Sequence, residues 1–375
     1  MYIKSLHVNN YKILSDLKIE FSAPEDRKNV VNVIAGVNGC GKTSLLKGIF
    51  ELDKKILLEF NDFYKKNEID FQEAVKICLE YGWRLISSLE SKIQNETNIF
   101  DAPRIIFMPS QLNFDYQTTH KIDTTYKFTT LINGNILGDA EFYIKEYILA
   151  KERESHIADP EQRKQAAIDS FNKHFKNTRL LTQLHDLDKN QYNRPVFQNI
   201  KGDLLTIEQL SDGEKQLYGR VVALMMLRPQ NSIILIDEPE LALHPAWQQE
   251  IMTIYSNIGK NNQFIVATHS PQIIANTAHK NLILLTKKDN KIIAIPRSQP
   301  PVAVDINAIL AEVMGAAIRP QAVEQLYKQY RELVDKQQED TEQGQKLKQA
   351  ILDYESPNSA FMQEMDLIKS LRSLS

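Results

Sequence analysis

Apolar and polar positions along the chain first predict an alternation of strands and helices. Leu17, Ile19 and Phe21 alternate with polar residues, which is typical of a half-buried strand. Residues 30–35 are almost continuously apolar and β-branched, as expected for a strand covered on both faces. A helix is expected to begin near Thr43. Its apolar face comprises Leu45, Leu46, Ile49 and Phe50.

The same pattern returns in the second half of the chain. A strand is predicted at residues 231–237, and residues 104–111 and 263–270 each predict a strand that leads into a loop. Residues 244–259 predict a helix, because a proline stands near its first turn and a glycine near its end. Residues 281–297 predict a hairpin that turns at residues 289–290. Alternating strands and helices favour the α/β fold class.

Two stretches of mostly helical character interrupt this core, at about residues 51–100 and 140–195. Both are expected to be helical insertions in one α/β domain over residues 1–300. Residues 301–375 are expected to form a helical C-terminal region, with an amphipathic helix around residues 326–334. That helix either serves partner or self-association or packs onto the chain's own core.

Composition narrows the class of protein further. The chain has 375 residues and a net charge of -3, which argues against a uniformly basic nucleic-acid coat but leaves a local basic groove open. Its two cysteines, Cys40 and Cys78, cannot build a disulfide framework. No apolar run approaches the length of a membrane span. A cytoplasmic protein without a membrane partner is expected.

The first chemical motif lies between the strand at residues 30–35 and the following helix. Gly36, Gly41, Lys42 and Thr43 fit the pattern G-x-x-x-x-G-K-[ST] in full. Glycines allow backbone N–H groups to surround phosphate oxygens, Lys42 would reach the β- and γ-phosphates, and Thr43 would ligate Mg²⁺. The alternative is a glycine-rich turn with a chance lysine. The predicted contacts with ATP are Gly36, Asn38, Gly39, Cys40, Gly41, Lys42, Thr43 and Ser44.

The second motif is a pair of carboxylates after the apolar strand at residues 231–237. Asp237 would hold Mg²⁺, and Glu238 is placed to polarise the attacking water. The alternative is an acidic loop after a buried strand. The sequence thus predicts ATP and Mg²⁺ as the cofactors, with Glu238 as a catalytic residue.

The third motif, LSDGEKQ at residues 210–216, precedes a helix. Phosphate loop, LSDGE, DEP and a later ATHS follow the order found in ABC-type ATPases, which this chain resembles. In that family the signature of one subunit caps the γ-phosphate held by the other. The resemblance makes Ser211, Asp212, Gly213 and Glu214 nucleotide-binding candidates in a homodimer or higher homo-oligomer. Asp212 departs from the family's second glycine, and a plain helix cap is the alternative.

Further residues are assigned through the same resemblance. His269, in ATHS, matches the histidine that senses the γ-phosphate in this family, whereas a structural histidine is the alternative. Gln111 resembles the loop glutamine that links the metal to the helical lobe. Residues 10–12 match a segment that touches the base in RecF- and Rad50-like heads. His244 lies where transporters have a different loop, and this departure resembles the RecF- and OLD-like branches.

The chain most resembles the ATPase subunits of Septu-type and retron-associated anti-phage systems. The insertions are too short for the coiled coils of Rad50 or SMC proteins, and residues 301–375 carry no Toprim-like acidic pattern. The resemblance implies slow, regulatory ATP hydrolysis that controls an HNH-type nuclease partner, with DNA or retron RNA–DNA as a further partner. The alternative is a RecF-like ATPase of DNA repair or recombination.

Overall fold

The computed structural model describes residues 1–25, 28–60, 103–110, 129–132, 140–176, 180–296 and 320–373. The chain divides into two compact units, Met1–Ile309 and Leu310–Ser375. The domain boundary expected at residue 300 falls in the stretch 297–319, outside the described residues. No helix in the described ranges is long and apolar enough to cross a bilayer.

A seven-stranded sheet forms the centre of the first unit, in the order β13-β12-β3-β11-β10-β5-β6. All neighbouring pairs are parallel except β12 and β13, which form an antiparallel hairpin at one edge. The strands are β3 (Val30–Gly36), β5 (Ile105–Met108), β6 (Thr129–Leu131), β10 (Ile233–Asp237), β11 (Gln263–Thr268), β12 (Leu282–Lys288) and β13 (Lys291–Pro296). The predicted strands and hairpin are therefore confirmed, and Asp289 and Asn290 turn the hairpin with positive φ angles.

The central strands are apolar because both faces of the sheet are covered. Every residue of β5, β10 and β11 is buried. The carboxyl ends of β3, β10 and β11 meet at one edge of the sheet, where ligands bind in open α/β folds. The phosphate loop and the DEP carboxylates follow β3 and β10 at this edge.

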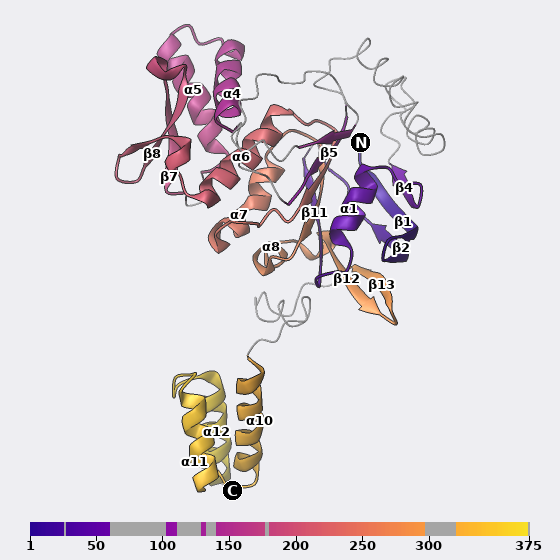
Figure 1. Cartoon of the computed structure of the whole chain (residues 1–375), viewed down its shortest axis with the longest axis vertical. Coiled ribbons are helices and arrows are strands. Elements are labelled where there is room, and N and C mark those ends of the chain that lie inside the picture. The colour runs from indigo at the N-terminus through magenta and orange to yellow at the C-terminus, as the bar shows by residue number, and fades with distance from the viewer. Residues whose placement is uncertain are drawn as a thin grey trace. The chain divides into compact units, whose positions relative to one another are not determined.

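A small antiparallel sheet covers helix α1 (Lys42–Phe50), which lies between it and the central sheet (Figure 1). Its strands are β2 (Leu14–Glu20), β1 (Ile3–Tyr11) and β4 (Ile56–Phe60). β4 contradicts the helix expected from about residue 51, because residues 56–60 pair with β1 and bury Ile56 and Phe60. Residues 61–102, the rest of that insertion, lie outside the described residues.

A separate lobe is built around the next insertion. It contains α4 (Ala140–Glu154), α5 (Pro160–Lys173), β7 (Thr182–Asp188), β8 (Arg194–Asn199) and β9 (Leu204–Leu205), with β7-β8-β9 as an antiparallel sheet (Figure 1). The helical insertion expected over residues 140–195 is therefore wrong beyond residue 173, where the chain turns into strands. Phe175 and Phe197 pack against Tyr218 with ring centroids 4.8 and 5.0 Å apart, which joins the lobe to helix α6 (Asp212–Met226).

Two further helices follow strands of the central sheet. They are α7 (Pro245–Ser256), the helix predicted after β10, and the short α8 (Pro271–Ala275) after β11. Short 3₁₀ turns lie at η3 (Lys189–Gln191), η4 (Ile207–Gln209) and η5 (His279–Asn281).

The second unit contains α10 (Gln321–Asp335), α11 (Glu342–Leu352) and α12 (Ala360–Ser373). The amphipathic helix expected around residues 326–334 is α10, which buries Tyr330 and Val334. The core of this unit consists of Tyr330, Val334, Ile351, Phe361, Met362 and Met365. The apolar side chains of α10 thus pack within their own unit.

Candidate nucleotide-binding and hydrolysis site

The phosphate loop depends on glycine at the positions where the backbone turns. Gly39 and Gly41 have φ angles of 77° and 89°, in the left-handed region that favours glycine. A Cβ at Gly41 would lie 2.8 Å from Leu14 Cδ2, whereas one at Gly39 would meet nothing within 4 Å. The β1–β2 turn therefore presses on one side of the loop, and Gly39 faces open space. Residues 10–12, the predicted base contact, belong to β1 and this turn.

Lys42 is buried inside the loop, and its ammonium faces four acceptors, of which Cys40 Sγ, at 3.8 Å, is the most distant. Lys42 Nζ donates to Gly36 O at 2.9 Å and Val37 O at 3.2 Å, and lies 3.3 Å from His269 Nδ1. Burial lowers the pKa of the Lys42 ammonium. An ammonium has three N–H donors, so the group is fully satisfied before any ligand arrives. A phosphate must therefore take over one or more of these bonds.

Thr43 and Asp237 bring two oxygens together at the ends of neighbouring elements. Thr43 Oγ1 donates to Asp237 Oδ1 at 3.0 Å. Asp237 is only 2% exposed, and burial raises the pKa of its carboxyl, against the opposing effect of the hydrogen bond from Thr43. One hydroxyl and one carboxylate oxygen are the protein ligands that Mg²⁺ takes when phosphates and water complete its shell. The residues present thus fit the predicted metal.

Glu238 and His269 face each other beside Lys42. Glu238 has a φ of 47°, and its N–H donates to Ala267 O at 2.8 Å, which holds this unusual backbone in place. Glu238 Oε1 lies 3.4 Å from His269 Nε2. Because Lys42 can only donate, His269 Nδ1 accepts and Nε2 carries the proton toward Glu238. Burial, followed by the nearby Lys42 charge, lowers the pKa of His269, which favours this neutral ring.

Glu240 also belongs to this cluster, although sequence reasoning missed it. Its Oε1 accepts from Thr268 Oγ1 at 2.8 Å and from the His269 N–H at 2.6 Å. Burial raises the pKa of the Glu240 carboxyl. The second glutamate of DEPE was the available signal, but a sequence pattern does not distinguish a buried carboxylate in a loop from an exposed one.

The signature residues form the N-terminus of α6, a set we call the signature tip (residues 211–214). Ser211 Oγ accepts from the Glu214 N–H at 3.3 Å, and Glu214 Oε2 accepts from the Ser211 N–H at 3.1 Å. The helix cap, which the sequence offered as the alternative interpretation, is therefore observed as a full capping box. Glu214 is buried and also accepts from Thr182 Oγ1 at 2.7 Å, which ties the tip to β7.

The two central residues of the signature tip face different surroundings. A Cβ at Gly213 would lie 2.7 Å from the Trp247 ring and 3.1 Å from Ala242 O, so only glycine fits there without displacement. The Asp212 side chain is 86% exposed and lies 3.5 Å from Lys215 Nζ. Asp212, the residue that departs from the family pattern, thus points into solvent.

The other predicted residues have mixed environments. Asn38 is exposed, Ser44 is half-buried and Cys40 is a buried free thiol. Gln111 lies outside the described residues. His244 caps α7, with Nδ1 accepting from the Ala246 N–H at 3.2 Å. Its observed role is therefore structural.

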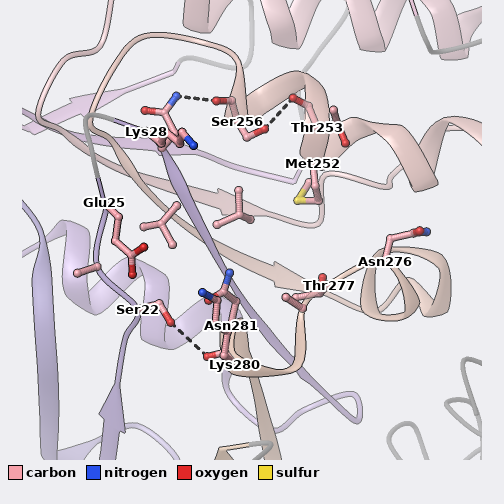
Figure 2. A pocket seen from close by; sticks show the side chains of 15 residues that line it. Ser22, Glu25, Lys28, Met252, Thr253, Ser256, Asn276, Thr277, Lys280 and Asn281 are labelled. Atoms are coloured by element: carbon pink, nitrogen blue, oxygen red, sulfur yellow. Dashed lines mark hydrogen bonds between the residues drawn. The ribbon is translucent and has the colours of Figure 1, made fainter. Parts of the chain in front are cut away.

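A cavity of about 480 Å³ lies apart from this cluster (Figure 2). Its wall includes Val30, the first residue of β3, so it is at the opposite end of that strand from the phosphate loop. Several polar groups of the wall bond one another: Ser22 Oγ donates to Lys280 O at 3.2 Å, and Ser256 Oγ donates to Thr253 O at 2.8 Å (Figure 2). The cavity is not part of the nucleotide site.

A lysine in the glycine-rich loop after one parallel strand and carboxylates at the end of another define a P-loop ATPase, and the capped LSDGE helix is the mark of the ABC type. The chain belongs to the family described as "AAA domain, putative AbiEii toxin, Type IV TA system", which matches residues 31–275.

The chain is also similar to curated proteins and to solved structures. The chain is 24% identical to "Retron Ec83 probable ATPase" of Escherichia coli, over 97% of this chain and 86% of that protein. It is 23% identical to "Septu protein PtuA" of Bacillus thuringiensis, over 84% of each chain. Among solved structures, the SMC head domain from Thermotoga maritima is 16% identical with a TM-score of 0.43, over 79% of this chain and 99% of that chain.

Proposed function

We propose that this ATPase binds Mg²⁺ and ATP at the cluster around Lys42 and acts as the sensor and regulatory subunit of an anti-phage defence complex. The convergence of Lys42, Asp237 and Glu238 at one sheet edge is the observation that carries the hydrolytic part. Relatives named for a retron and for Septu, matched over most of both chains, support the defence part.

Each side chain has a distinct chemical task in this proposal. Lys42 binds the β- and γ-phosphates after exchanging its bonds to Gly36 O and Val37 O. Thr43 and Asp237 hold Mg²⁺, which supplies charge neutralisation at the phosphates. Glu238 accepts a proton from the attacking water, and neutral His269 redirects its Nε2–H from Glu238 to the γ-phosphate once ATP is bound.

The signature tip is proposed to close the site of a second copy of the chain. Ser211 and Asp212 are exposed at a helix N-terminus, where backbone N–H groups favour an anion. Among the described residues, no hydrogen bond or ion pair joins the signature tip to the chain's own phosphate loop, residues 36–43. A head-to-tail pair, with ATP sandwiched between the two copies, would give the tip its ligand.

Glu238→Gln tests the hydrolytic part. It keeps the size of the side chain but removes the base, so phosphate release should fall by about 10²-fold or more while ATP binding persists. Equal rates for the variant and the wild type would contradict Glu238 as the base. Glu250→Gln makes the same chemical change on α7, away from the site, and should hydrolyse ATP like the wild type.

Co-expression with the product of the neighbouring gene tests the regulatory part. An HNH-type nuclease that copurifies, together with a mass that changes when ATP is added, is the expected result. A chain that purifies alone with and without ATP would contradict a regulatory subunit, even if its ATP hydrolysis were intact. DNA or retron RNA–DNA retained by the complex would identify a nucleic-acid partner.

A further inference from the structure

Glu240 is a buried acidic side chain for which the proposed chemistry has no use. Both of its hydrogen bonds use one oxygen, Oε1, which binds the Thr268 hydroxyl and the His269 N–H. Its other oxygen, Oε2, is buried and lacks a hydrogen-bond partner among the described residues. An unsatisfied buried carboxylate oxygen costs free energy, so the contacts made by Oε1 demand an explanation.

On one side, Glu240 fixes the loop that carries His269. Thr268 Oγ1 donates to Glu240 and accepts from the Ser270 N–H at 2.9 Å. Ser270 Oγ in turn donates to Gln248 Oε1 on α7 at 2.7 Å. The backbone of His269 is thus held from both sides while its ring reaches toward Lys42.

On the other side, the loop that carries Glu240 touches the signature tip. Glu240 O accepts from the Leu243 N–H at 3.0 Å, which closes a tight turn around Ala242, whose φ is 63°. Ala242 O and the Trp247 ring both lie close to Gly213. One short loop therefore contacts His269 through the Glu240 side chain and the signature tip through its backbone.

We propose that Glu240 is a positioning residue that couples His269 to the signature tip of the same chain. The inference rests on the proposed function, because it assumes that His269 meets the γ-phosphate of one ATP and the tip meets the other. A displacement of His269 by the γ-phosphate would move Glu240, then Ala242 and Gly213. The coupling requires an acceptor oxygen within hydrogen-bond distance of the Thr268 hydroxyl and the His269 N–H. It does not require a negative charge on that side chain.

Two substitutions at Glu240 separate the effect of side-chain length from the effect of side-chain charge. Glu240→Gln keeps an acceptor oxygen at the same reach, so the rate of ATP hydrolysis should stay close to that of the wild type. Glu240→Asp keeps the charge but is one methylene shorter, so kcat should fall roughly 10- to 100-fold through misplacement of His269. ATP affinity, measured by direct binding, should be unchanged in both because Lys42 and the phosphate loop are intact.

Glu250→Asp makes the same chemical change on α7 and serves as the matched control. Wild-type hydrolysis by Glu240→Asp would overturn the inference, as would an equal loss in Glu240→Gln.

If Glu240→Asp melts at a markedly lower temperature, Thr268→Val replaces it. That variant removes one of the two bonds and should lower kcat without changing ATP affinity, and an unchanged kcat would again overturn the inference. Wild-type hydrolysis by Lys42→Ala would instead contradict the proposed function itself.

Discussion

The phosphate loop and the signature tip are both helix N-termini, yet their first turns are occupied differently. The N-cap of helix α1 is Gly41, which has no side chain to bond the first N–H groups of the helix and so leaves them to an anion. The N-cap of helix α6 is Ser211, whose capping box with Glu214 already uses one N–H group of the first turn. We therefore expect the first end to receive phosphate directly and the second to add contacts to a nucleotide that is already bound.

This difference assigns separate energetic roles to the two ends. Changes in the phosphate loop should remove nucleotide binding itself. Changes in the signature tip should leave binding intact and act on hydrolysis and on association of two copies. Substitutions in the phosphate loop and in the signature tip test whether the two roles are separate.

Lys42→Ala should have the largest effect. It removes an ammonium that is buried and already directed at the loop, and hydrogen bonds to charged groups stabilise strongly, so ATP affinity should fall roughly 100-fold. Titration with ATP measures this. Lys54→Ala, in the exposed turn after α1, should bind like the wild type. Unchanged affinity in Lys42→Ala would remove the basis for the assignment.

Gly213→Ala should have the largest effect among substitutions in the signature tip. A Cβ there would overlap the Trp247 ring at 2.7 Å, so the signature tip must shift, and hydrolysis should fall about 10-fold with ATP affinity unchanged. Adding Trp247→Leu removes the clash and should restore part of the rate. A Gly213→Ala variant that loses ATP binding would show that the signature tip also contributes to nucleotide binding, so that the two helix ends do not have separate roles.

Asp237→Asn should stabilise the nucleotide-free protein by about 1 kcal/mol while ending hydrolysis. Burial raises the folded-state pKa of Asp237 above 3.8, so the folded state binds the proton more tightly and its stability falls as pH rises past that value. The advantage of the variant in thermal melting should therefore be present at neutral pH and disappear near pH 4. A variant less stable than the wild type at neutral pH would contradict this.

Asp212→Asn should have the smallest effect. The Asp212 carboxylate is exposed at the signature tip and would repel an approaching phosphate, so its neutralisation should strengthen ATP-dependent association about two- to fivefold at low salt. Added salt should erase the gain because exposed charges are screened. A gain that persists at high salt would exclude repulsion as the cause.

The sequence predicted which residues would come together because they follow short local patterns. Gly41 and Lys42 follow one apolar strand and Asp237 ends another, and the structure brings these residues to one edge of the sheet. The strands β4 and β7 were missed because each is defined by its partner strand and not by its own residues. Glu240 and Trp247 were missed for the same reason, since a contact with His269 or Gly213 leaves no mark in either segment.

A purified heterodimer tests the sandwich most directly. One subunit carries Lys42→Ala and the other carries Gly213→Ala, each with its own affinity tag, so that sequential purification yields only the mixed pair. One composite site then combines an intact phosphate loop with an intact signature tip. Hydrolysis well above that of either variant alone is the result we expect. A mixed pair as inactive as the two parent variants would contradict closure of each nucleotide site by the sister chain.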